Sequence, residues 1–233
     1  MSSLSKTALM LAALASLSWA GAATAQTVEV APGVQVTKKS YAAPINEQPF
    51  YGFAEKTPEQ RALDERFVTT LTDGLGTRQR AFDDAATRAW RAIYMGNMSE
   101  AARRFNQAFL LAPEQSGLYH GYAVVVQMRF NDAEYAEELF KIARKQPNPL
   151  KTLNADYGRF LLMVRRPRDA QPVLEQAVID APDFGDAWSN LAFARIQNGD
   201  RVAACAAADE AAKRNPSVNA SSDIALLRRN AQC

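Results

Sequence analysis

Few side chains in this sequence have the type and spacing that catalysis or metal binding requires. His120 is the only histidine, and no motif supplies the further ligands of a metal site or the partners of a Ser/His/Asp relay. The glycines Gly74 and Gly76 do not extend to a phosphate-binding loop. Asp83-Asp84 and Glu137-Glu138 are adjacent on expected helices, so the two carboxylates of each pair point in different directions. The sequence therefore predicts a protein that is not an enzyme, with no catalytic residue, no metal and no cofactor.

The dominant pattern in the sequence is a repeat. Pro113, Pro147, Pro182 and Pro216 are 34, 35 and 34 residues apart, and each follows an Ala-rich amphipathic segment. A proline ends a helix because it lacks the amide proton and clashes with the preceding turn. A period of about 34 residues predicts helix–turn–helix hairpins that stack into a solenoid, since one hairpin cannot bury its apolar stripe alone.

The best copy of the repeat runs from 185 to 216. Its first helix has Trp188, Leu191 and Ala192, its turn has Gly199 and Asp200, and its second helix has Ala204, Ala208 and Ala211. This pattern resembles the tetratricopeptide repeat (TPR). Three further copies precede it, and the register of the second slips by one residue near Asn131, where the turn glycine is missing. The resemblance implies an all-α, right-handed α-solenoid of about four TPR hairpins, at about 82–115, 116–149, 151–184 and 185–218.

The segments outside the repeats divide the chain further. Residues 26–56 hold three prolines and the cluster Phe50, Tyr51 and Phe53, and are expected to form an extended or disordered arm. A leading helix is expected from Thr57 to Asp73-Gly74, with a capping box to Gln60, covering the exposed face of the first hairpin. A capping helix is expected within 221–233, so that the TPR domain spans 57–233.

The first 25 residues have the pattern of a signal peptide. Lys6 precedes an apolar run from Ala8 to Ala20, and Ala23-Thr24-Ala25 suits cleavage after Ala25; an uncleaved anchor is the alternative. The net charge of +2 falls to +1 without Lys6, and no basic stripe indicates nucleic acid or an anionic membrane. We expect a periplasmic protein that binds no nucleic acid and has no stable membrane insertion.

The two cysteines, Cys205 and Cys233, are expected to meet in such an exported chain. Cys205 lies at the start of the second helix of the last repeat, and an antiparallel capping helix would bring Cys233 back towards it. A disulfide is the favoured interpretation. The alternative is that Cys205 is a small buried residue and Cys233 a frayed end.

The TPR resemblance implies a concave groove lined by the first helices of the hairpins. The residues expected to form this partner-binding groove follow, or lie one turn from, the small residue at each helix crossing: Trp90, Tyr94, His120, Val124, Gln127, Met128, Arg159, Met163, Asn190, Phe193 and Gln197. Their mixture of aromatic, thioether and polar groups suits a peptide or protein partner. Alternatively, Phe50–Phe53 of the arm fills the groove. The Lys/Asn/Arg clamp of some TPR domains looks absent, because Ala86 and Trp90 occupy two of its places.

These features favour a non-enzymatic adaptor that holds a protein or peptide partner in the cell envelope. Analogy with other exported TPR proteins suggests pilus or secretion-system assembly. The alternative function is a periplasmic small-molecule-binding protein or an accessory subunit of an enzyme.

Overall fold

The computed structural model describes residues 26–214 and 216–233. The expected signal peptide, residues 1–25, lies outside the described residues.

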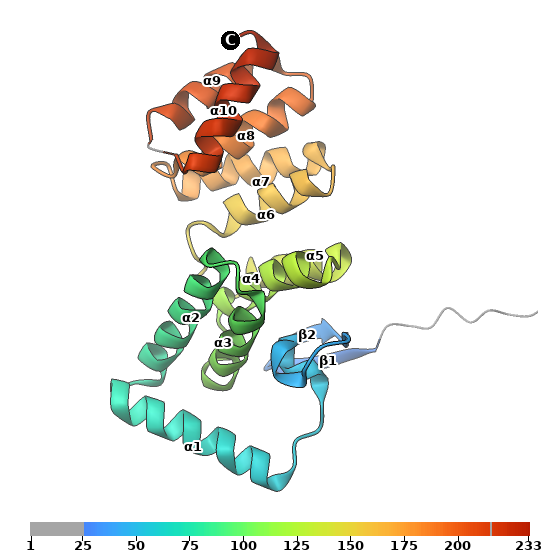
Figure 1. Cartoon of the computed structure of the whole chain (residues 1–233), viewed down its shortest axis with the longest axis vertical. Coiled ribbons are helices and arrows are strands. Elements are labelled where there is room, and N and C mark those ends of the chain that lie inside the picture. Colours follow the sequence, from blue (N-terminus) through green and yellow to red (C-terminus); the bar gives the residue numbers. More distant parts are fainter. Residues whose placement is uncertain (1–25, 215) are drawn as a thin grey trace, which may run out of the picture.

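Four helical hairpins stack in chain order along the long axis of the molecule (Figure 1). They are α2 (Arg78–Tyr94) with α3 (Met98–Leu111), α4 (Ser116–Val125) with α5 (Ala133–Ala143), α6 (Leu153–Met163) with α7 (Pro167–Asp180), and α8 (Gly185–Gln197) with α9 (Arg201–Ala212). Helix α1 (Pro58–Leu75) precedes the hairpins, and α10 (Val218–Ala231) packs on α8 and α9. This arrangement is the all-α solenoid of TPR hairpins that the repeat predicts.

Small residues stand where the helices cross. Ala89, Ala123 and Ala192 are fully buried, and a Cβ atom added to Gly158 would lie 2.3 Å from Cγ of Leu174. Only a hydrogen atom fits there. Larger side chains, Phe105, Phe140 and Leu174, are buried between the helices and fill the remaining space. The core is therefore continuous from hairpin to hairpin, as expected where each repeat needs its neighbours for burial.

The turn inside each hairpin contains a residue with left-handed backbone. Glycine occupies this place in the first and fourth hairpins, at φ +72° for Gly96 and +90° for Gly199. The next residue caps the second helix: the side chain of Asn97 accepts a hydrogen bond from the amide of Glu100, and Asp200 accepts one from Ala203. In the third hairpin the left-handed residue is Arg165, at φ +61°, with an exposed side chain.

Replacing Arg165 with glycine is expected to raise the free energy of unfolding by about 0.5–1 kcal/mol. A left-handed L-residue is disfavoured by about 1–2 kcal/mol, and the greater freedom of glycine in the unfolded chain removes part of that gain. Denaturant unfolding measures the change. The matched control is Gln176→Gly, an exposed position well inside α7, where glycine should lower stability by about 0.5–1 kcal/mol. Equal effects at both positions would contradict the role given to the turn.

The second hairpin contains one extra residue in its first helix. After Val125 the helix continues as a π-helical turn, η3 (Val126–Phe130), and ends at Asn131 with φ +52°. Asn131 comes eight residues after Ala123, whereas the corresponding residue of the other hairpins comes seven after the small one. A π turn accommodates a single inserted residue in a helix. This insertion is the origin of the register slip in the sequence.

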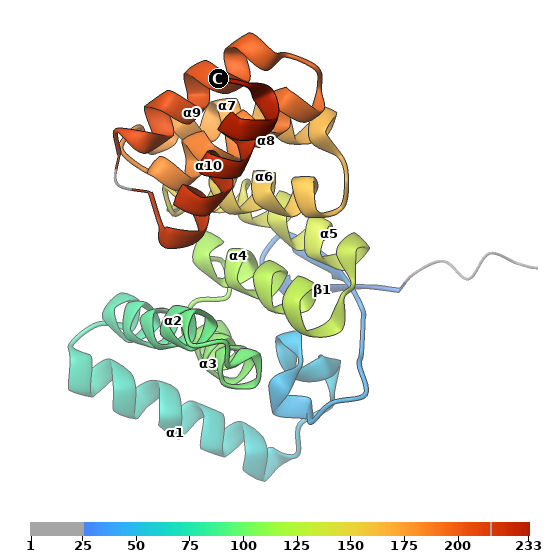
Figure 2. The same ribbon diagram turned by 45° about the horizontal axis from the view of Figure 1, so that its top comes forward.

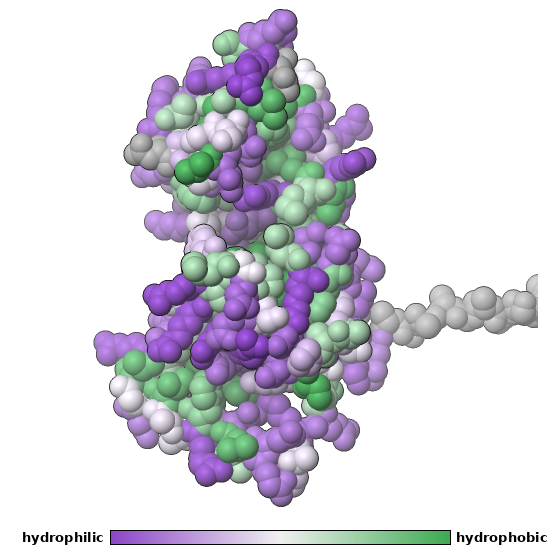
Figure 3. Space-filling view, in the orientation of Figure 1, coloured by the Kyte–Doolittle hydropathy of each residue, from purple (hydrophilic) through white to green (hydrophobic). Residues whose placement is uncertain are grey.

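The two terminal helices differ slightly from expectation. The capping box of Thr57 and Gln60 is present, but α1 continues past Asp73 and Gly74 to Leu75, because the left-handed residue that ends it is Gly76 at φ +82°. Helix α1 covers the first hairpin only in part: it has no buried residue, and Leu63 is 58% exposed. Figure 3 shows apolar surface over α1, whereas the surface over α2 and α3 is mainly hydrophilic on that face. Helix α10 begins at Val218, before the expected 221, with Ser217 as its N-cap.

The expectation of an extended or disordered arm over 26–56 is wrong for most of that segment. Strands β1 (Thr27–Ala31) and β2 (Val34–Thr37) form an antiparallel hairpin around Gly33, and two short 3₁₀ turns follow, η1 (Ile45–Glu47) and η2 (Pro49–Phe53). Figures 1 and 2 show this arm beside the first two hairpins, where it contacts α3 and α5. The arm folds because Val36 and Phe50 are buried against the helices.

Among the described residues, no helix has the length and apolarity needed to cross a membrane.

Candidate protein-binding groove

A pocket of about 370 Å³ opens between the first three hairpins. We call it the groove. Seven of the predicted residues line it, from three successive first helices: Trp90 and Tyr94 on α2, Val124, Gln127 and Met128 on or just after α4, and Arg159 and Met163 on α6. Because equivalent positions of stacked hairpins lie side by side, residues distant in the sequence form one surface.

The rim of the groove is unusually apolar for a solvent-facing surface. Tyr94 is 85% exposed, Met128 57% and Met163 52%. Two charged groups lie on the α6 side, the carboxylate of Asp156 and the guanidinium of Arg159. Met side chains adapt their shape to a partner, and large aromatic side chains contribute strongly to binding energy. The groove can therefore bind an apolar segment and orient it by hydrogen bonds at one end.

The prediction that His120 lines the groove is wrong, because its side chain is fully buried beneath the floor. The imidazole ring lies 4.6 Å from the ring of Trp90 and 5.9 Å from that of Phe140, measured between centroids. Its Nε2 atom is 2.9 Å from Oδ2 of Asp156, which joins α4 to α6. The bulky Trp90 side chain of the preceding hairpin covers His120, so the histidine supports the floor instead of meeting solvent.

The three residues predicted on the fourth hairpin also lie outside this pocket. Asn190, Phe193 and Gln197 belong to α8, and Phe193 is half-buried against the core. The lining set ends at α6. The groove was predicted to run across all four hairpins, but the pocket is lined only by the first three.

The structure adds lining residues that the stripe of first-helix positions does not include. They are Ile93, Met98, Phe140 and Phe160. Phe140 comes from the second helix of its hairpin and lies in the floor of the groove, almost fully buried. No pattern in the sequence marks Phe140 as a groove residue, because it lies on a second helix and the expected lining follows the first helices.

The arm does not fill the groove. Phe50 is buried between α3 and α4, with its ring centroid 5.3 Å from that of Phe109 and 4.8 Å from that of Tyr122. None of the described arm residues lines the groove. The alternative in which the arm fills the groove is therefore wrong, because the arm packs on a different surface.

An ion pair holds the second and third hairpins together beside the groove. The carboxylate of Glu137 on α5 contacts Nη1 of Arg166 at 2.5 Å and Nζ of Lys141 at 2.8 Å. Burial alone would raise the pKa of Glu137, but these hydrogen bonds and charges outweigh it and lower the pKa below its ordinary value. The carboxylate therefore stays charged and keeps the hairpins joined near neutral pH.

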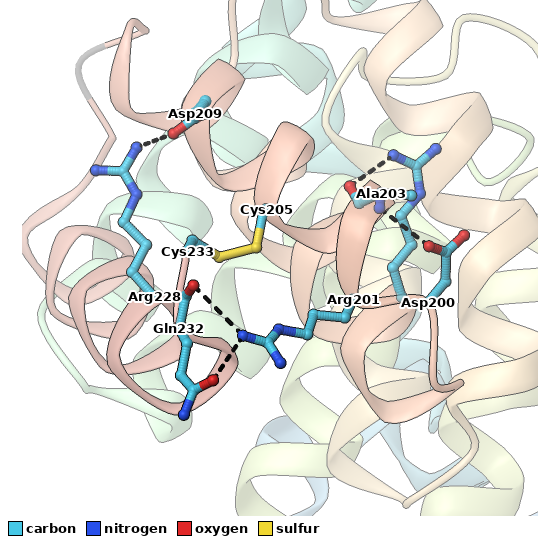
Figure 4. The surroundings of a disulfide bond; sticks show 9 residues. Asp200, Arg201, Ala203, Cys205, Asp209, Arg228, Gln232 and Cys233 are labelled. Carbon is cyan, nitrogen blue, oxygen red and sulfur yellow. Dashed lines mark hydrogen bonds and ion pairs between the residues drawn. A yellow bond between two sulfur atoms is a disulfide. The ribbon is translucent and has the colours of Figure 1, made fainter.

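Chemically reactive groups are few in the part of the chain that the structure describes. No group of three or more His, Cys, Asp or Glu residues in residues 26–214 and 216–233 could hold a metal ion. The expected disulfide is present: Cys205 on α9 is joined to Cys233, with 5.6 Å between their Cα atoms (Figure 4).

Comparisons with known proteins identify the fold. PilF of Pseudomonas aeruginosa is similar at 20% identity and a TM-score of 0.58, over 66% of this chain and 71% of PilF. The TPR protein TTC0263 of Thermus thermophilus is 15% identical with a TM-score of 0.52, over 70% of this chain and 98% of TTC0263. YrrB, described as a TPR protein with an unusual peptide-binding site, is 15% identical with a TM-score of 0.51, over 72% of this chain and 85% of YrrB. No family model and no curated protein matches the sequence. The chain has the fold of bacterial TPR proteins.

Proposed function

We propose that this protein is a non-enzymatic scaffold that binds an apolar segment of a partner protein in the groove of its first three hairpins. The observation that carries the proposal is the exposure of Tyr94, Met128 and Met163 around one pocket. Contiguous exposed apolar surface on a soluble protein usually marks an interaction site. The peptide-binding site of the TPR protein YrrB supports the same use of this fold.

We further propose that the scaffold acts in the periplasm, in an envelope assembly. The signal-peptide pattern of residues 1–25 and the Cys205–Cys233 bridge support export, because disulfides persist in oxidising compartments. Assembly of pili or secretion systems is the narrower proposal and rests on the analogy with exported TPR proteins.

Photo-crosslinking tests the groove in the intact protein. Benzoylphenylalanine at position 94 should crosslink one main partner in envelope extracts, whereas the same group at position 202 should not. Val202 is 84% exposed on α9 and lies outside the groove, which makes it a matched control. Equal crosslinking from both positions would show that the groove is not the binding surface.

Binding of the purified partner should weaken by about 30-fold when Tyr94→Ala and Met163→Ala are combined. Truncating the main residues of an interface costs about 2 kcal/mol or more, and both side chains are exposed, so the fold should stay intact. The control combines Ile179→Ala and Val202→Ala, which truncates two exposed apolar residues elsewhere. Isothermal titration and the melting temperature measure both effects. Unchanged affinity would refute the groove, and stabilisation by a metabolite in a thermal-shift screen would favour the small-molecule alternative.

Trp90 and Phe193 are unsuitable for this experiment. Trp90 packs against Phe105 and His120, and Phe193 packs half-buried against the core. Truncating them would change stability as well as binding.

A further inference from the structure

The arm residues Ile45–Phe53, which we call the arm segment, are held by a fully buried amide. Asn106 on α3 donates hydrogen bonds from Nδ2 to the carbonyl oxygens of Asn46 (2.9 Å) and Gln48 (2.8 Å). Its Oδ1 accepts from the amide of Tyr51 (3.3 Å) and from the hydroxyl of Tyr122 (2.5 Å). Every hydrogen-bonding position of the amide is therefore used, and three of the four contact the main chain of the arm segment.

Two arginines hold the one carboxylate of the arm segment. Glu47 pairs with Arg103 of α3 and with Arg129 of the π turn, and only 14% of its side chain is exposed. Hydrogen bonding from Arg129 lowers the pKa of Glu47, so the group is charged at neutral pH. Arginine is well suited to this contact because its planar guanidinium matches a carboxylate.

An aromatic pocket receives Phe50, three residues after Glu47. Phe50 is 4% exposed, among Phe109 of α3 and Tyr119 and Tyr122 of α4. Its amide donates a hydrogen bond to the hydroxyl of Tyr122 at 3.3 Å. Burial raises the pKa of Tyr122 well above its ordinary value, so the hydroxyl keeps the proton that it donates to Asn106.

The three contacts lie in order along one face of α3. Arg103, Asn106 and Phe109 are spaced by three residues, so they follow one another on the helix surface. Arg103 contacts the carboxylate of Glu47, Asn106 the main chain, and Phe109 the ring of Phe50. Proteins commonly recognise a short linear segment in this way, because main-chain hydrogen bonds give affinity and side-chain sites give specificity.

The arm segment itself adopts an unfavourable conformation in this site. Phe50, Tyr51 and Phe53 have φ of +54°, +53° and +57°, the left-handed region that L-residues with side chains avoid. Such conformations persist only where surrounding contacts impose them. The arm segment is therefore a weaker ligand than its contacts alone would make it.

The arm remains attached on both sides if this segment leaves. Before it, the ring of Tyr41 stacks on Phe130 at 3.9 Å between centroids, and Lys39 pairs with Asp132 at 3.1 Å. After it, residues 54–57 connect to α1 and are largely exposed. Displacement also breaks the hydrogen bonds of the Gln48 side chain, which accepts from the amide of Tyr41 (2.8 Å) and donates to the carbonyl oxygen of Ala43 (2.7 Å).

We propose that this face of α3 and α4 is a second peptide-recognition site, occupied by the protein's own arm segment and open to a partner segment with an acidic residue three positions before an aromatic one. The partner segment replaces Glu47 between the two arginines and Phe50 in the aromatic pocket. The site shares no lining residue with the groove, so it stands or falls independently of the proposed function.

The test uses the full chain with Phe50→Ala, which removes the aromatic anchor of the arm segment. The probe is a fluorescein-labelled peptide of residues 44–53, and fluorescence anisotropy measures its binding. We expect saturable binding to Phe50→Ala at least tenfold tighter than to the wild-type chain, in which the site is occupied. Peptides with Glu47→Lys or Phe50→Ala should bind at least tenfold more weakly, and adding Arg129→Glu to the protein should abolish binding.

A second variant keeps the proposal testable if Phe50→Ala fails to fold. Glu47→Lys places a cation between two arginines and should release the arm segment while leaving every core side chain unchanged, as faster hydrogen exchange of residues 46–51 would show. The peptide should then bind this variant as well. If the folded variants release the arm segment but bind no peptide, or if exchange shows the segment still seated in both, the contact is purely structural and the proposal is wrong.

Discussion

Replacing Gly158 with leucine is expected to unfold the third hairpin or to lower the free energy of unfolding by about 3 kcal/mol. Overpacking a filled core typically costs about 1–3 kcal/mol, and here even a Cβ atom would lie 2.3 Å from Cγ and 2.4 Å from Cδ2 of Leu174. The Leu174 side chain cannot move aside, because it is itself fully buried. Denaturant unfolding followed by circular dichroism measures the loss.

The matched control for this prediction is Gly74→Leu. Gly74 lies inside α1, is exposed, and would have no heavy atom within 4 Å of an added Cβ. Leucine should stabilise that helix by up to about 1 kcal/mol through its better helix propensity. A loss at Gly158 as small as a few tenths of a kcal/mol would contradict the repeat register.

Removing the disulfide by Cys205→Ser with Cys233→Ser is expected to destabilise the C-terminal repeat by up to about 3–4 kcal/mol. The bridge joins residues 28 apart, and the chain-entropy estimate for a loop of that length gives this value as an upper figure. The bridge holds α10 over α8 and α9, where Ala220, Ile224 and Leu227 are buried. Loss of the cap should therefore expose apolar surface of the fourth hairpin.

Unfolding of the oxidised and the double-serine proteins measures this effect, with Arg228→Ala as the control. Arg228 joins the same two helices through an exposed ion pair with Asp209 (Figure 4), and exposed pairs contribute about 0–1 kcal/mol. Mass mapping without reductant should find the linked peptides. Two free thiols in protein purified without reductant would refute the pairing.

The solenoid is predictable from the sequence because its physical requirements are local and repeated. Pro182 ends a helix, and Gly158 marks a close crossing, wherever the neighbouring hairpins lie. The arm is different. Val28, Val30, Val34 and Val36 alternate around Pro32-Gly33, which is a strand-and-turn signal, but the three prolines of the same segment favour an extended or disordered chain. The left-handed turn at Phe50 has no such signal, because it depends on a pocket formed by residues more than fifty positions later.

The groove is predictable only in part, because the position of a residue on a helix does not fix what covers it. Tyr94 and Met163 lie on the rim as expected. His120 has an equally suitable position, but the Trp90 ring of the preceding hairpin covers it. The groove also ends at α6, although the equivalent positions continue onto α8.

The extra residue in the second hairpin makes that hairpin the unit of this array that cannot be exchanged for a standard one. A 34-residue consensus repeat in its place would restore an ordinary α-helical turn and rotate the following residues by about 100°. Arg129 and Phe130 would then turn away from Glu47 and Tyr41, their partners on the arm. Engineered versions that shorten, lengthen or reorder this array should therefore keep the second hairpin and the arm together as one cassette.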